Sequence, residues 1–347
     1  MATAGGLYVH KHTGVPSGRE DYLTLVIIHD YVWHGEYPGA VPYTAEERAL
    51  IPPVPDKPRT DENEIRSATG MLETFMRDRA HELYEALQGL VTERNILPAN
   101  SASQKAGGIV LVGWSTGATW MPALLSHVRE FQNGGVNLGD YIRRIALWDP
   151  PSWLLGYPFP EKEWYDPLFD TSLSHEERDQ AFTKWITSYF SHGETLDEFE
   201  QRKPLRTPPS SIAAMSKDEY ENTVHVPPAG LPGGSDWAVL YGCAQLGVYE
   251  TLRKGALYLS LNVDGKTNAA SEWPHVEVRY VWGDHSVWEV PYVAQLLRQE
   301  VAEAKKHGRP IRKVTTLRVR GANHFGQWDL PERTLQALLV DAEDRVV

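Results

Sequence analysis

The chain has 347 residues, of which 41% are hydrophobic and 23% charged, a composition that excludes a disordered or low-complexity protein. Its formal charge of 34 − 46 = −12 repels phosphate backbones and anionic membrane surfaces, so we expect no nucleic-acid partner. The single cysteine, Cys243, excludes an internal disulfide. Neither a membrane span nor a secretory signal is apparent, and a cytoplasmic protein is expected.

Short runs of apolar, largely β-branched residues predict five strands buried on both faces. These runs lie at 23–29, 108–113, 145–148, 276–282 and 314–319. Apolar residues at three- and four-residue steps predict helices between or after the strands, at 65–91, 290–304 and 335–339. The alternation predicts an α/β fold: a mostly parallel sheet with helices on both faces and right-handed crossovers.

One long segment interrupts this alternation. Residues 150–275 contain twelve of the 24 prolines, eleven of them between Pro150 and Pro232, and many aromatic residues, with helical patterns near 176–189 and 237–252. A segment this long between two strands is too large for a loop. We expect a core made of 1–149 and 276–347, with 150–275 forming a cap or lid over the carboxyl ends of the strands. A second helical domain docked beside the core is the alternative.

The motif Gly113-Trp114-Ser115-Thr116-Gly117 directly follows a predicted strand and precedes an apolar helical stretch. A serine on such a strand-to-helix turn, flanked by glycines, is typical of a nucleophile elbow. The turn would expose the Ser115 hydroxyl, and the N–H of Thr116 could bind a developing oxyanion. A glycine-flanked helix cap is the structural alternative.

A serine nucleophile needs a base and an acid, which on this fold follow it in the order acid, then histidine. His324 lies just after the last predicted strand and is the predicted base. For the acid we favour Asp284, which ends the preceding strand. Asp149, at the end of the 145–148 strand, and Glu289 remain alternatives.

With these motifs the chain resembles the α/β-hydrolase superfamily, through 113–117, Asp284 and Gly321-Ala-Asn-His324. It is also similar to a fungal group with a large cap within that superfamily, through 25–29 and 37–43. The resemblance covers nearly the whole chain. It implies acyl transfer to water from an ester, thioester, amide or lactone, with a small-molecule substrate.

The sequence departs from the family pattern in three places. His29-Asp30 replaces the usual His-Gly after the oxyanion-loop strand, and by position the second oxyanion donor is the N–H of Tyr31. The family's acid position is occupied by Ser286. The proline-rich stretch 36–60 contains no strand-like run, so one strand and one helix near the N-terminus are expected to be missing.

The sequence therefore predicts a serine hydrolase of the carboxylesterase or lactonase type, acting on a small, moderately apolar substrate through an acyl-enzyme. It predicts no cofactor and no metal, because no cluster of ligand residues has metal-site spacing. A catalytically impaired or ligand-binding protein on the same fold is the alternative. The oligomeric state is not predicted.

Overall fold

A single parallel sheet forms the centre of the molecule. The computed structural model describes residues 2–4, 7–9, 22–30, 33, 51–52, 59–99, 107–132, 134–224, 234–260 and 272–341. The sheet has the order β3 (Thr24–Ile28), β4 (Ile109–Trp114), β5 (Ile142–Trp148), β6 (Glu277–Gly283), β7 (Val314–Val319). Every neighbouring pair is parallel, which confirms the predicted sheet. A separate antiparallel pair is formed by β1 (Ala2–Ala4) and β2 (Leu7–Val9).

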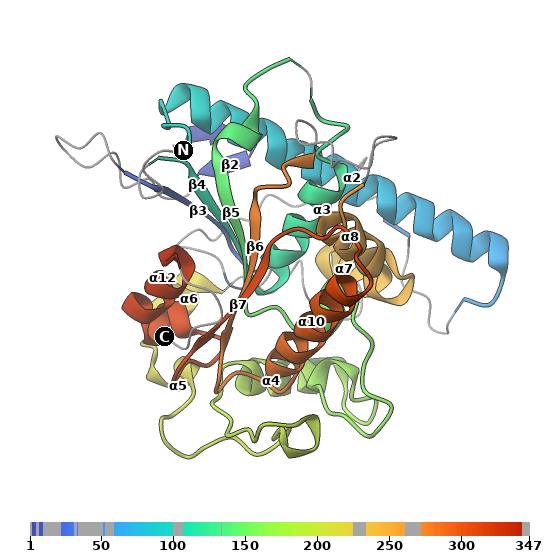
Figure 1. The fold of residues 1–347 in the computed structure, drawn as a ribbon. Helices are drawn as coiled ribbons and strands as arrows, with labels where there is room; N and C mark the ends of the chain where they lie inside the picture. The colour runs from blue at the N-terminus through green and yellow to red at the C-terminus, as the bar shows by residue number, and fades with distance from the viewer. Residues whose placement is uncertain are drawn as a thin grey trace.

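Helices connect and surround these strands (Figure 1). The α-helices are α2 (Glu62–Glu93), α3 (Trp120–His127), α4 (His175–Ile186), α5 (Ser211–Ala214), α6 (Lys217–Thr223), α7 (Ser235–Gln245), α8 (Val248–Leu257), α10 (Glu289–Lys306), α11 (Gly326–Asp329) and α12 (Pro331–Leu339). Short 3-10 helices are η1 (Ser115–Thr119), η2 (Leu138–Asp140), η3 (Ser152–Leu155), η4 (Pro167–Phe169) and η5 (Leu196–Glu198).

Successive side chains of β5 point to opposite helical layers, as the strand's two-residue period requires. Ile145 and Leu147 face a small gap that is also lined by residues of α3, α8 and α10. On the other face, Arg144 donates from Nη1 to the Leu338 carbonyl of α12 at 3.0 Å. The predicted arrangement of helices on both faces is therefore confirmed (Figure 1).

A buried ionic cluster holds α12 against this second face. Glu277 of β6 pairs with Arg144 at 3.0 Å and with Arg279 at 2.8 Å. Burial raises the pKa of Glu277, but the two guanidinium groups outweigh it and hold the pKa below its usual range. Arg279 also donates to the Ala337 carbonyl at 3.1 Å. The cluster thus joins two strands to the carboxyl end of α12.

The sequence of the long helix α2 explains its N-terminal end and its buried face. Asp61 caps it by accepting hydrogen bonds from the backbone N–H groups of Asn63 and Glu64, at 3.0 and 2.9 Å. Acidic side chains in the first turn also suit the positive end of the helix dipole. Most of its apolar stripe is buried, as the spacing predicts, including Leu72, Phe75, Met76, Leu83 and Leu87, whereas Ile65 and Leu90 are only partly buried.

The strands differ in burial, and here one prediction is wrong. All six residues of β4 are buried, but Ile27 of β3 is 57% exposed. The reason is position: among the described residues β3 is an edge strand, paired only with β4. The predicted absence of a strand and helix falls on 36–60, of which only 51–52 and 59–60 are described, so it stays a prediction.

The last helices of the 150–275 segment lie on the core. Helix α8 packs along α3, where Gly255 approaches Ser126 closely enough that an added Cβ would overlap the hydroxyl. The helical pattern predicted at 237–252 is two helices, α7 and α8, because Gly247 between them adopts a left-handed conformation with φ 72°. The division into core and cap remains a prediction.

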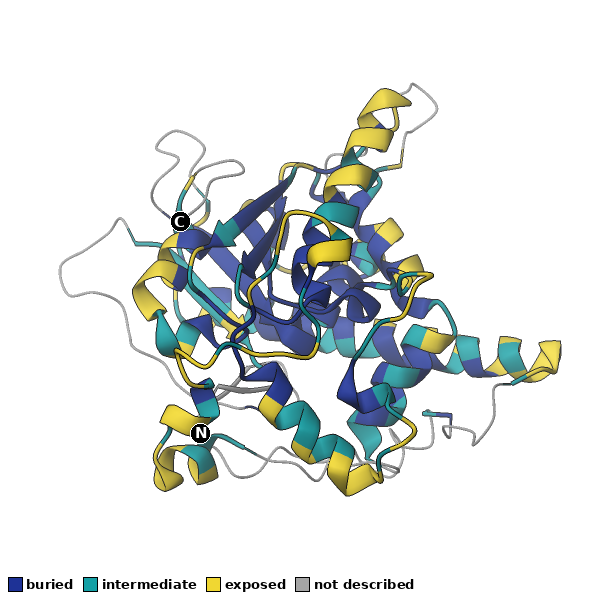
Figure 2. Cartoon of the chain, turned by 90° about the horizontal axis from the view of Figure 1, so that it is seen from below, coloured by how far each residue is buried: buried dark blue, intermediate teal, exposed yellow. Residues whose placement is uncertain are grey.

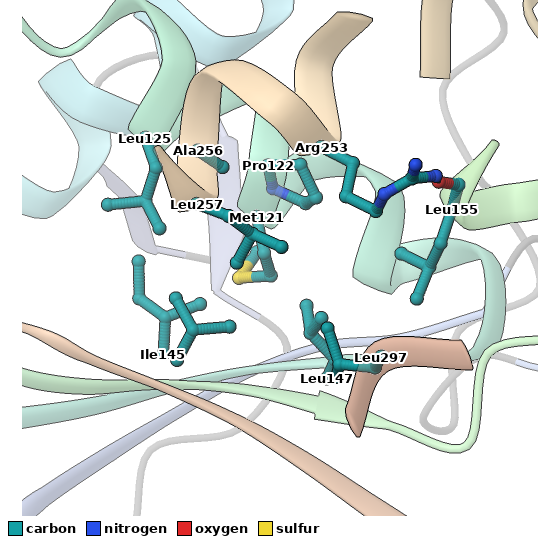
Figure 3. A pocket seen from close by; sticks show the side chains of 11 residues that line it. Met121, Pro122, Leu125, Ile145, Leu147, Leu155, Arg253, Ala256, Leu257 and Leu297 are labelled. Atoms are coloured by element: carbon teal, nitrogen blue, oxygen red, sulfur yellow. The ribbon is translucent and has the colours of Figure 1, made fainter. Parts of the chain in front are cut away.

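The interior is tightly packed. The strands of the sheet are mostly buried, with the exposed residues on the surrounding helices and loops (Figure 2). Between α3, α8 and β5 lies a gap of about 10 Å³, lined mainly by apolar side chains (Figure 3). This volume is at the lower limit of the roughly 10–15 Å³ that a single water molecule needs. The gap is therefore part of the core rather than a substrate pocket.

Candidate active site

Ser115 occupies a sharp turn at the carboxyl end of strand β4, which lies between β3 and β5. Its φ of 51° is left-handed, a conformation that costs energy for a residue with a Cβ and that often marks a functional position. The residue begins η1, which leads into α3, and it is 6% exposed. The strand, turn and helix expected around this serine are all present.

The two glycines of the motif allow this turn to pack closely. A Cβ on Gly113 would overlap the Gly117 carbonyl, and a Cβ on Gly117 would overlap the His29 carbonyl and lie 2.7 Å from the Ile28 carbonyl. Real Cβ contacts are not this short, so only glycine fits at either position. The turn is thereby pressed against the end of β3, whose next residues are His29 and Asp30.

His324 follows β7 and is completely buried. Its Nδ1 lies 2.7 Å from Oδ2 of Asp149. Because a carboxylate only accepts hydrogen bonds, Nδ1 carries the proton and Nε2 is left with its lone pair. Nε2 has no hydrogen-bond partner among the described atoms. Trp114, which immediately precedes Ser115, donates from its indole N–H to the His324 carbonyl at 3.1 Å, so the histidine loop is fastened to the serine turn.

Asp149 is fixed by a set of hydrogen bonds of its own. Like Ser115 it has a left-handed φ, 57°, and it is fully buried at the end of β5. Its Oδ1 accepts from the Gly283 backbone N–H at 2.7 Å, and its Oδ2 accepts from the Ser286 hydroxyl at 2.5 Å. The unusual backbone turn directs the carboxylate across the end of β6 toward His324.

The predicted contact between Asp284 and His324 is wrong. Asp284 instead accepts from the Gly321 backbone N–H at 2.6 Å and pairs with Arg318 at 3.1 Å. It therefore braces the loop that carries His324. The physical reason is register: Ser286, two residues further on, is the residue that reaches the histidine's acid, and it does so as a hydroxyl donor to Asp149. The other alternative, Glu289, begins α10 and is buried beside Asp166.

The N–H of Thr116, the expected oxyanion donor, already has a partner. It donates to Oδ1 of Asp30 at 3.2 Å, and the Thr116 hydroxyl donates to the same oxygen at 2.5 Å. Asp30 is 5% exposed. Tyr31, expected to supply the second donor, lies outside the described residues. The pair His29-Asp30 is unusual in the sequence, but no sequence pattern indicates a carboxylate on Thr116.

Aromatic side chains surround the histidine. The ring of Trp114 lies 5.6 Å from that of His324 and 5.2 Å from that of Phe325. Phe325 in turn packs edge-on against Trp33, whose ring centroid is 4.7 Å away. Trp33 also contacts Tyr220 of α6 at 6.0 Å. The His324 ring thus has two aromatic neighbours, Trp114 and Phe325, beside its contact with Asp149.

Part of the 150–275 segment is hydrogen-bonded to the histidine loop. Asn323 donates from its side-chain amide to the Thr187 carbonyl at 2.9 Å and to the Ser211 hydroxyl at 2.8 Å. Asp329, in α11, accepts from Tyr189 and Ser211 at 2.6 and 2.5 Å. This segment therefore helps to fix the position of His324.

Two further features bear on the kind of site. Within the described parts of the chain, no group of three or more His, Cys, Asp and Glu side chains is placed to hold a metal ion. None of the helices in those parts combines the length and the apolar character required to cross a bilayer.

The chain matches no protein-family model and no curated protein sequence. Solved α/β-hydrolase structures resemble it at low similarity. A peroxisomal α/β-hydrolase from Saccharomyces cerevisiae is 11% identical, with 91% of this chain and 75% of that chain covered and a TM-score of 0.35. A carboxylesterase from Bacillus subtilis is 12% identical, with 93% and 85% covered and a TM-score of 0.32. A thioesterase domain from the curacin biosynthetic pathway is 13% identical, with 92% of each chain covered and a TM-score of 0.33. Similarity at this level identifies no function, which we infer from the site alone.

Proposed function

We propose that this protein is a serine hydrolase that cleaves an ester, thioester, amide or lactone through an acyl-enzyme. Ser115 Oγ attacks the substrate carbonyl while its proton passes to Nε2 of His324. The tetrahedral intermediate collapses, its bond to the leaving group breaks, and the leaving group takes that proton. Water, activated by the same nitrogen, then attacks the acyl-enzyme and releases the acid and Ser115.

The observation that supports this proposal most is the hydrogen bond between Asp149 and His324. At 2.7 Å, with both groups fully buried, it selects the tautomer that a general base requires. Asp149 also stabilises the imidazolium that forms when Nε2 takes the serine proton. We therefore assign the acid of the triad to Asp149, the residue that the sequence ranked second.

The proposed substrate is small and moderately apolar. Three aromatic rings gather near the base, those of Trp33, Trp114 and Phe325. The 150–275 segment, as a cap, would exclude water from the reacting carbonyl and strengthen the electrostatic interactions there. Chemistry of the carboxylesterase or lactonase type fits these surroundings.

A fluorophosphonate probe tests the proposal, because it phosphonylates only an activated serine. We expect the purified protein to be labelled, and Ser115→Ala to lose both labelling and the turnover of short p-nitrophenyl esters. Ser172→Ala, which removes an exposed hydroxyl far along the chain, is the matched control and should be labelled like the wild type. Equal labelling of Ser115→Ala and wild type would contradict the proposal.

A second candidate function is a ligand-binding or catalytically impaired protein on the same fold. It is favoured by one observation, the carboxylate of Asp30 bonded to the N–H of Thr116. Folded wild-type protein that neither reacts with the probe nor turns over esters would support this candidate.

A further inference from the structure

The Asp30 carboxylate occupies the position that an acyl-transfer enzyme keeps free for the substrate oxyanion. Two donors of Thr116, its N–H and its hydroxyl, converge on Oδ1 of Asp30, at 3.2 and 2.5 Å. No described lysine, arginine or histidine side chain lies within salt-bridge distance of this carboxylate. Its negative charge is therefore held by the donors of Thr116.

This arrangement conflicts with oxyanion stabilisation. In the transition state of acyl transfer, negative charge develops on the carbonyl oxygen, which the N–H after the nucleophile stabilises. An N–H already bonded to a carboxylate offers less to a second anion, and two negative charges side by side in a buried site repel. Asp30 is 5% exposed, so water screens this repulsion little.

We propose that Asp30 blocks the oxyanion site, so that Ser115 is acylated only when the Asp30 side chain is displaced from Thr116. The inference rests on the proposed function, in which Thr116 donates to the oxyanion. Asp30, which replaces the usual glycine after His29, would then limit the rate of the reaction. A glycine there would have no side chain to reach Thr116.

Three substitutions test the block by the rate of fluorophosphonate labelling at Ser115. Asp30→Ala removes the carboxylate, and Asp30→Asn keeps its shape but removes the charge. Thr116→Val keeps the N–H and removes the hydroxyl that holds Asp30. Losing one oxyanion donor in a serine protease costs about 10²- to 10³-fold in kcat. We therefore expect Asp30→Ala to react at least about 10-fold faster than wild type, with the other two variants in between.

The matched control is Asp78→Asn, which removes one exposed carboxylate from α2 and should leave the rate unchanged. A second measurement does not depend on reactivity. In protein labelled with 15N-threonine, the Thr116 amide signal can be assigned by its loss in Thr116→Val. We expect its proton resonance to move upfield in Asp30→Asn, because the charge-assisted hydrogen bond is weakened.

The outcomes separate the two proposals. If wild type reacts at Ser115 but the Asp30 variants react no faster, the block is disproved and the proposed function stands. A Thr116 resonance that does not move also disproves the block, and the proposed function is then decided by the labelling alone. If wild type is inert and Asp30→Ala reacts at Ser115, the block is supported and the wild type is the impaired form. If every folded variant is inert, both proposals fail, since Asp30→Ala frees the donor.

Discussion

At the scale of single residues, the site depends on two side chains in left-handed backbone conformations. Ser115 and Asp149 both follow parallel strands, with φ of 51° and 57°. The turn at Asp149 directs its carboxylate across the end of β6 to His324, which follows β7. The proposed nucleophile and the proposed acid therefore come from adjacent strands, β4 and β5.

The assignment of Asp149 as the positioning acid gives a prediction. We expect Asp149→Asn to lower kcat for ester hydrolysis by about 10³- to 10⁴-fold with little change in KM, because the amide no longer fixes the tautomer of His324. The rate against pH should lose the inflection that comes from a histidine base. Steady-state kinetics with p-nitrophenyl acetate measure both effects.

The matched substitution is Asp284→Asn. It should keep the hydrogen bond from the Gly321 N–H through the amide oxygen, losing only a partly exposed ion pair with Arg318 that is worth about 0–1 kcal/mol. We expect its kcat to stay within about threefold of wild type. A larger loss in Asp284→Asn than in Asp149→Asn would overturn the assignment.

At the scale of elements, the contact between α8 and α3 supports the serine turn from below. Helix α3 begins five residues after Ser115, and α8 lies against it through Gly255. A side chain at Gly255 would overlap Ser126, so the two helices approach closely only because this residue has none.

We predict that Gly255→Val destabilises the protein by about 1–3 kcal/mol, because the added side chain separates α8 from α3. The free energy of unfolding in urea measures this. Gly70→Ala is the control: nothing lies within 4 Å of its added Cβ in the middle of α2. Since alanine is the better helix former, that variant should be up to about 1 kcal/mol more stable than wild type. Equal stability of the two variants would show that the α3–α8 contact is not tight.

At the scale of the whole molecule, we expect a buried pair of acids to make the free energy of unfolding depend on pH. Asp166, in the 150–275 segment, and Glu289, at the start of α10, are 2% and 1% exposed. Burial raises the pKa of Asp166 to about 7, and burial together with the charge of Asp166 raises that of Glu289 well above its usual value. No described cationic side chain lies within salt-bridge distance of either.

A raised carboxyl pKa means that the folded state holds protons that the unfolded state releases near pH 4. The contribution of this pair to the free energy of unfolding is therefore present at low pH and is lost as pH rises from about 4 to about 7. Replacing Asp166 with Asn removes that loss. We expect Asp166→Asn to gain about 2 kcal/mol relative to wild type between pH 5 and pH 8.

Urea unfolding at a series of pH values measures this difference. Asp218→Asn, which removes an exposed carboxylate from α6, should give a curve parallel to that of wild type. Parallel curves for Asp166→Asn and wild type would mean that the pKa of Asp166 is not raised in the folded state.

The sequence by itself determined the architecture and the position of the serine turn. Apolar runs of strand length located the five described strands of the parallel sheet to within three residues, because the sheet lies in the interior and its strands are nearly continuous hydrophobic runs, the edge strand β3 included. The Gly113–Gly117 motif placed Ser115 on its turn, and position after the last strand marked His324. These features are local, so a single stretch of sequence carries them.

Only the tertiary structure decided which groups these residues meet. Asp149 and Asp284 both end parallel strands, and the sequence gives no measure of the backbone turn that directs one carboxylate to His324 and the other to Gly321. The carboxylate of Asp30 on Thr116 likewise joins positions 86 residues apart. Such contacts depend on the relative placement of strand ends, which packing of the whole sheet fixes and no local pattern records.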